Sequence, residues 1–131
     1  WVSDVRAGTV FHIDLDGKVT TVADVLSRPF GLGFLPNGDL LVALMTQRLI
    51  LKFRAGNQTI HADMADFASG YLRDLAVACD GNVYVTSFDS DAYGPDCLAS
   101  ARLLLATPDG NFGRLATQAG AIERSSQTSR G

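Results

Sequence analysis

The feature that most limits how this chain can fold is an alternation of short strand-like segments with tight turns. Asn-Gly or Asp-Gly pairs occur at residues 16–17, 37–38, 80–81 and 109–110. These pairs supply the residues with positive φ that tight β-hairpins require. Segments rich in β-branched and other apolar residues recur about every ten residues, and none shows the amphipathic pattern of a three-turn helix. The sequence therefore predicts an all-β chain.

The strand segments form a repeating unit. Residues 33–43 align with residues 76–86 at an offset of 43 positions, and residues 1–3 align with one strand of each unit. A four-stranded unit that repeats every ~40–45 residues is typical of a β-propeller blade. We therefore expect an incomplete ring of about two and three-quarter four-stranded antiparallel blades. The expected strands span residues 1–4, 9–14, 18–23, 30–35, 39–45, 48–53, 58–62, 72–78, 82–88, 102–106 and 112–116.

The repeat divides the chain into three units and a tail. If the strands of a blade are labelled A to D outward from the central channel, residues 1–24 supply strands B to D of blade one. Residues 30–62 form blade two, and residues 72–116 form blade three. The polar residues 117–131 are expected to be disordered or to lie outside the propeller. Antiparallel order places the tight A–B and C–D turns on one rim and the longer B–C and D–A loops on the other, where binding is expected.

Composition and charge narrow the functional classes. Hydrophobic residues make up 47% of the chain and charged residues 19%, which is typical of a globular domain with a core. The net charge of −3 gives no attraction to nucleic acid or to anionic lipid. No apolar run approaches the ~20 residues of a membrane-spanning helix. The first residues show no signal-peptide pattern, which favours a cytoplasmic location.

The cysteines, histidines and one acidic segment are interpreted as structural. Cys79 and Cys97 are expected on opposite rims, separated by a strand of ~17 Å, whereas a disulfide needs Cα atoms within ~7 Å. We therefore expect no bridge between them. His12 and His61 fall in outer strands and are interpreted as packing residues. The acidic residues 89–96 lack the glycine and glutamate spacing of an EF-hand and are interpreted as a solvated loop.

Four segments resemble a known family. They are residues 1–14 (WVSDVRAGTVFHID), 28–42 (RPFGLGFLPNGDLLV), 70–85 (GYLRDLAVACDGNVYV) and 105–110 (LATPDG). They are similar to the gluconolactonase, senescence-marker-protein (regucalcin) and luciferin-regenerating-enzyme group of six-bladed β-propellers. The resemblance implies a hydrolase that opens a lactone with a divalent cation, calcium or zinc, at the mouth of the central channel.

The resemblance also implies which residues lie at the channel mouth. The family's Asn-Asp pair at the head of an A strand aligns with Arg73-Asp74, so Arg73 occupies a metal-ligand position. Arginine has no lone pair to donate and carries a permanent positive charge, so we assign no metal ligand and expect no cofactor in this chain. Asp74 is the candidate catalytic carboxylate, and Tyr71 and Arg73 are the candidate channel-mouth residues. The other implied ligands fall before residue 1 and after residue 116.

Three functional hypotheses stay open. The first is a partial relative of metal-dependent lactone hydrolases that is inactive as an isolated chain; an active form would take a small-molecule lactone or ester. The second is a binding or structural module whose three-blade lobes self-associate through open blade edges, since six blades need roughly 260 residues. The third is a stand-alone β-sandwich.

Overall fold

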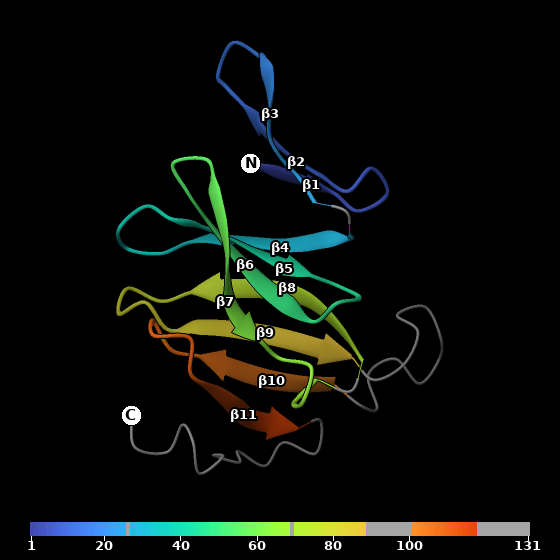
Figure 1. The fold of residues 1–131 in the computed structure, drawn as a ribbon, viewed down its shortest axis with the longest axis vertical. Helices are drawn as coiled ribbons and strands as arrows, with labels where there is room; N and C mark the ends of the chain where they lie inside the picture. The colour runs from blue at the N-terminus through green and yellow to red at the C-terminus, as the bar shows by residue number, and fades with distance from the viewer. Residues whose placement is uncertain (26, 69, 89–100, 118–131) are drawn as a thin grey trace.

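The part of the chain that the structure describes folds into three antiparallel β-sheets. The structure, a computed structural model, describes residues 1–25, 27–68, 70–88 and 101–117. Figure 1 shows the sheets following one another in chain order from the top to the bottom of the molecule. None of the elements in these ranges is a helix that could cross a membrane. The strands are β1 (Val2–Asp4), β2 (Thr9–Ile13), β3 (Val19–Asp24), β4 (Pro29–Phe34), β5 (Leu40–Leu44), β6 (Leu49–Arg54), β7 (Asn57–Asp63), β8 (Tyr71–Val77), β9 (Val83–Phe88), β10 (Ala101–Ala106) and β11 (Phe112–Thr117).

Each sheet pairs strands that are neighbours in the chain. The orders are β1-β2-β3, β4-β5-β6-β7 and β8-β9-β10-β11, and every pair is antiparallel. All eleven strands expected from the sequence are present, each with ends within one residue of the expected ones. The predicted fold class is confirmed, because the described residues form an all-β structure of blade-like sheets that do not close a ring.

The Asn-Gly and Asp-Gly turns share one hydrogen-bond pattern. In the second, the Gly38 N–H donates to the Leu35 carbonyl (2.8 Å), and the Leu35 N–H donates to the Asp39 carbonyl (2.9 Å). The same two bonds recur at the other three turns, and each turn glycine has a positive φ. A fifth tight turn uses Ala55 (φ 49°) and Gly56, which a search for Asn-Gly and Asp-Gly pairs does not find.

Strand β5 is buried along its whole length because an apolar core lies on each of its faces. Leu40, Val42 and Leu44 contribute to the core shared with the first sheet. Leu41 and Ala43 contribute to the core shared with the third sheet. Because both faces of β5 are covered, its sequence is a continuous apolar run. A strand with one face in water would instead alternate apolar and polar residues.

The second and third sheets approach each other most closely along their first strands. Strand β4 packs against β8, and a Cβ added at Gly31 would lie 2.6 Å from both the Arg73 carbonyl oxygen and the Leu75 nitrogen. The pairing register shifts between Pro29 and Leu32 in β4 and between Leu72 and Leu75 in β8, at positions related by the 43-residue repeat. Glycine at position 31 therefore lets two irregular strand heads lie side by side.

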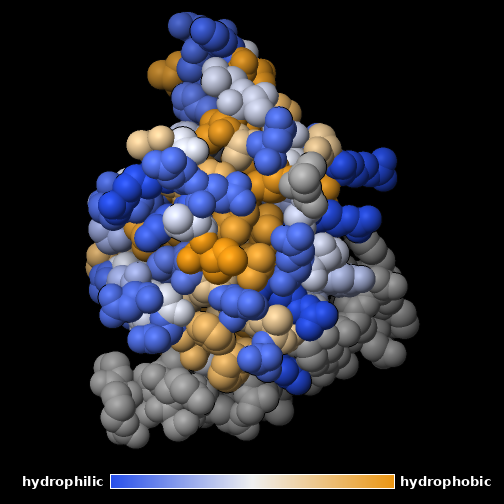
Figure 2. Space-filling model, viewed as in Figure 1, coloured by the Kyte–Doolittle hydropathy of each residue, from blue (hydrophilic) through white to orange (hydrophobic). Residues whose placement is uncertain are grey.

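The first sheet is the least covered part of the fold. Figure 1 shows the β2–β3 hairpin extending away from the other two sheets. A groove of about 380 Å³ lies between this sheet and the outer strands of the second, with Leu44, Leu49, Leu51 and Ile60 among its lining residues. Figure 2 shows apolar side chains gathered near the centre of the face in view, with polar side chains around them.

An ion pair joins the A–B turn of blade two to the end of β6. The Arg54 guanidinium donates to both carboxylate oxygens of Asp39 at 2.7–3.0 Å, and the Asp39 side chain is only 7% exposed. These hydrogen bonds hold the pKa of Asp39 below its ordinary value of 3.8. The charged form of the carboxylate is therefore the one that the fold stabilises.

Replacing the Asp39 carboxylate with an amide is expected to make the free energy of unfolding depend less on pH below about 4. Because folding lowers the pKa of Asp39, its contribution is complete above the unfolded pKa near 3.8 and is lost as the pH falls further. Thermal unfolding of Asp39→Asn should give a lower Tm than the parent at pH 7, with a difference that narrows below pH ~4. A difference that stays constant down to pH ~2 would contradict this assignment.

Candidate functional site

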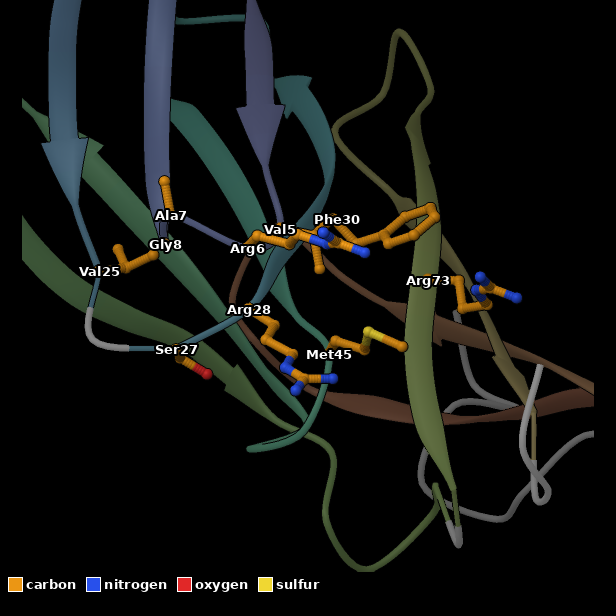
Figure 3. Close-up of a pocket in the computed structure, with 10 residues that line it drawn as sticks. All are labelled: Val5, Arg6, Ala7, Gly8, Val25, Ser27, Arg28, Phe30, Met45 and Arg73. Atoms are coloured by element: carbon orange, nitrogen blue, oxygen red, sulfur yellow. The ribbon is translucent and has the colours of Figure 1, made fainter. Parts of the chain in front are cut away.

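A cavity of about 800 Å³ lies on the rim formed by the B–C and D–A loops. Its walls come from the β1–β2 connection, the β3–β4 connection, the head of β4, the end of β5 and the head of β8, as Figure 3 shows. This is the rim on which the sequence predicts binding. The lining residues are Val5, Arg6, Ala7, Gly8, Val25, Ser27, Arg28, Phe30, Met45 and Arg73.

Backbone hydrogen bonds hold the loops around the cavity in place. The Asp4 carboxylate accepts the N–H groups of Arg6 (3.0 Å) and Ala7 (2.9 Å), which fixes the β1–β2 turn. The Val25 N–H donates to the Gly8 carbonyl at 2.8 Å and joins this turn to the β3–β4 connection. The arrangement is therefore a set of short, tied loops on a rigid sheet scaffold.

A second set of hydrogen bonds joins strands of all three sheets around the cavity. The Met45 N–H donates to the Arg28 carbonyl (2.8 Å), and the Leu72 N–H donates to the Met45 carbonyl (3.1 Å). The Ser3 hydroxyl donates to the Phe30 carbonyl at 2.7 Å, from β1 to β4. The cavity thus lies where blades one, two and three meet.

The lining of the cavity is cationic. Arg6, Arg28 and Arg73 all contribute to it, and no carboxylate is among the lining residues that the structure describes. The guanidinium groups of Arg6 and Arg28 form no hydrogen bond or ion pair with any described residue. A lining that carries arginines and no carboxylate favours an anion over a cation.

Arg73 is held between two aromatic rings. Its guanidinium carbon lies 4.8 Å from the ring centre of Phe30 and 5.5 Å from that of Phe88. Its Nε atom is buried and has no hydrogen-bond partner among the described residues. Arg73 belongs to the β8 wall of the cavity. In Figure 3 its side chain points away from the ends of Arg6 and Arg28, so its guanidinium does not join theirs.

The other candidate residues lie near this wall but do not line the cavity. Tyr71 is the first residue of β8, is half-buried and pairs with Phe88 in the ladder. Asp74 is exposed, and its backbone N–H donates to the Thr86 hydroxyl (3.2 Å). The Asp74 carboxylate forms no ion pair with Arg73 or with any other described residue.

The histidines occupy outer strands. His12 packs against Trp1 with ring centres 4.7 Å apart. His61 is buried in β7, and this burial lowers its pKa below the ordinary value. A buried imidazole with a lowered pKa stays neutral and fits a packing role.

Some predicted features fall outside the described residues. Cys79 is exposed with a free thiol, whereas Cys97 lies in the undescribed range 89–100, so the disulfide prediction stays a prediction. The acidic segment 89–96 and residues 118–131 of the tail also lie outside the described residues.

The rim cavity does not fit a catalytic divalent cation. Calcium and zinc need several oxygen, nitrogen or sulfur donors that converge on one point. The charged residues of the lining are three arginines, and a guanidinium only donates hydrogen bonds. No group of three or more His, Cys, Asp or Glu side chains that could hold a metal occurs among the described residues.

Comparison with known proteins supports the fold. No protein-family model and no curated protein matches the sequence. Among solved structures, a candidate gluconolactonase superposes with a TM-score of 0.68 at 15% identity over 88% of this chain and 43% of its own. A gluconolactonase from Xanthomonas campestris gives 0.67 at 21% identity over 88% and 42%. A luciferin-regenerating enzyme gives 0.63 at 16% identity over 83% and 35%.

These similarities show the fold. The chain has the architecture of part of a gluconolactonase-like β-propeller. It spans less than half the length of the solved structures that it matches. The fold that the sequence resemblance implies is therefore confirmed.

Sequence reasoning missed three of the residues that shape the cavity. Arg6, Arg28 and Phe30 lie in or directly after the rim loops that the repeat marks as functional. A search of those loops for charges of one sign finds both arginines. The alignment at an offset of 43 residues also gives Phe30 the position in blade two that Arg73 has in blade three.

Proposed function

We propose that this chain forms three blades of a lactone-hydrolase-type propeller and that it does not hydrolyse lactones as an isolated chain. The similarity to gluconolactonases over 88% of the chain supports the first part. The arginine-lined cavity supports the second, because lactone opening on this scaffold uses a cation to polarise the carbonyl and the attacking water. Calcium- or zinc-dependent hydrolysis would need donors from outside the described residues.

The hydrolysis of glucono-δ-lactone tests this proposal. The rate should equal the spontaneous rate with calcium, with zinc and with a chelator, while a gluconolactonase assayed in parallel should be active. Arg73→Asn should also be inactive, because one restored amide cannot supply the several ligands that a catalytic cation needs. Hydrolysis by the parent chain that a chelator abolishes would refute the proposal.

A second candidate function is a structural or binding module whose three-blade lobes associate. The observation that favours it is an exposed apolar patch made by two aromatic rings, Trp1 beside the free edge of the first sheet and Phe34 at the end of β4. These side chains are 50% and 39% exposed, and their rings lie 5.1 Å apart. Exposed strand edges beside apolar side chains favour association between chains.

A further inference from the structure

We propose that the rim cavity binds a small organic carboxylate with an apolar body, held by Arg6 and Arg28. This inference goes beyond the proposed function, because it concerns equilibrium binding of an anion and does not depend on hydrolysis. It rests on the pairing state of the arginines, on the way the loops hold them and on the composition of the cavity walls.

The pairing state separates these two arginines from others in the fold. Arg54 is paired with a carboxylate, and Arg48 and Arg102 each donate to a backbone carbonyl, at 3.0 and 3.1 Å. Arg6 and Arg28 have no acceptor among the described residues, although the chain as a whole carries a net charge of −3. Their donors are available to a ligand, and a planar guanidinium matches a carboxylate through two parallel hydrogen bonds.

Two different loops bring Arg6 and Arg28 to the wall of the same cavity. Figure 3 shows Arg6 directed toward Phe30 and Arg28 directed toward Met45. The Asp4 carboxylate fixes the backbone at Arg6, and the Met45 N–H fixes the carbonyl of Arg28. A ligand therefore meets donors whose backbone positions are already set, which lowers the entropic cost of binding.

The remaining walls define the body of the ligand. Half of the ten lining residues are apolar, and Phe30 is held in place by its stacking with Arg73. A cavity of about 800 Å³ is in the range of small-molecule sites. An inorganic anion would leave these apolar walls in water, whereas a carboxylate with an aryl or alkyl body would cover them. Together these walls and the two arginines select an amphipathic anion.

Calorimetric titration of the intact chain with 3-phenylpropionate tests the inference. The matched alcohol, 3-phenylpropan-1-ol, has the same body without the charge. We expect 3-phenylpropionate to bind with Kd of about 1 mM or tighter and the alcohol to bind at least tenfold more weakly. Inorganic phosphate should also bind at least tenfold more weakly than 3-phenylpropionate.

Variants assign the binding to the two arginines. Arg6→Gln and Arg28→Gln should each weaken 3-phenylpropionate binding about tenfold, because each removes one charge-assisted contact. Lys18→Gln removes one positive charge from an exposed turn on the opposite rim and should leave Kd unchanged. Both arginines are exposed, so unfolding curves should show that the variants stay folded.

Three outcomes would overturn the inference. They are no heat of binding up to about 10 mM 3-phenylpropionate, equal binding of the acid and the alcohol, and phosphate binding as tight as that of the acid. An unchanged Kd in the folded arginine variants would overturn the assignment to these side chains. Because 3-phenylpropionate has no bond to hydrolyse, none of these results depends on the outcome of the lactone assay.

Discussion

Replacing Gly31 with valine is expected to destabilise the fold by about 3 kcal/mol, or to prevent folding. An added Cβ would lie 2.6 Å from the carbonyl oxygen of Arg73 and from the nitrogen of Leu75. Both are backbone atoms of β8 and cannot turn away as the end of a side chain can. The two strands would have to separate, which would open the core between blades two and three. Urea unfolding followed by circular dichroism measures the loss.

A matched substitution on the neighbouring strand controls for the added volume. Ala76 is exposed in β8, so Ala76→Val adds side-chain carbons where solvent already reaches. We expect this variant to change the free energy of unfolding by less than about 0.5 kcal/mol. If Gly31→Val were as stable as Ala76→Val, strands β4 and β8 would not approach each other as the structure has them.

The purified chain is expected to form dimers or larger assemblies at micromolar concentration. Trp1 and Phe34 form an exposed apolar patch, and β1 pairs with only one strand, β2, in the described sheet. Burying this patch against a second copy would remove apolar area and an unpaired strand edge from water together. Sedimentation velocity over a range of concentrations measures the distribution of species.

Charged substitutions show whether the patch drives this association. The double variant Trp1→Glu with Phe34→Glu should weaken self-association more than tenfold, because it replaces both rings of the patch with charged side chains. Leu15→Glu makes the same kind of change at a fully exposed turn residue outside the patch and should have no effect. A monomeric parent chain that unfolds cooperatively would contradict the association and favour a self-contained sandwich.

The elements of this fold follow from local patterns in the sequence. Glycine-containing turns and strand periodicity place all eleven strands, since both signals act within a few residues. The expected strands 48–53 and 58–62 also place a turn between them, but not the positive φ of Ala55 (49°), for which alanine carries no preference. There the pairing of β6 with β7 imposes the conformation on the residue.

The candidate site is harder to predict because its residues are distant in sequence. Arg6 and Arg28 line one cavity because the β2–β3 hairpin returns the chain to the rim where it left β1. Neither residue carries a motif, so only the assembled loops show that both charges line the same site. The stacking of Arg73 on Phe30 depends on neighbouring blades placing equivalent strand heads side by side. The 43-residue repeat indicates that equivalence but not the contact.

A calorimetric titration of the chain with calcium and with zinc tests the central claim most directly. The claim is that this rim of a lactonase-like propeller carries arginines where a catalytic cation would need donors. A unit charge ~4 Å from a divalent ion costs about 2 kcal/mol even in water. The account predicts no binding tighter than about 1 mM for either cation, in the parent and in Arg73→Asn alike. A stoichiometric site with Kd below about 10 μM in the parent chain would contradict it.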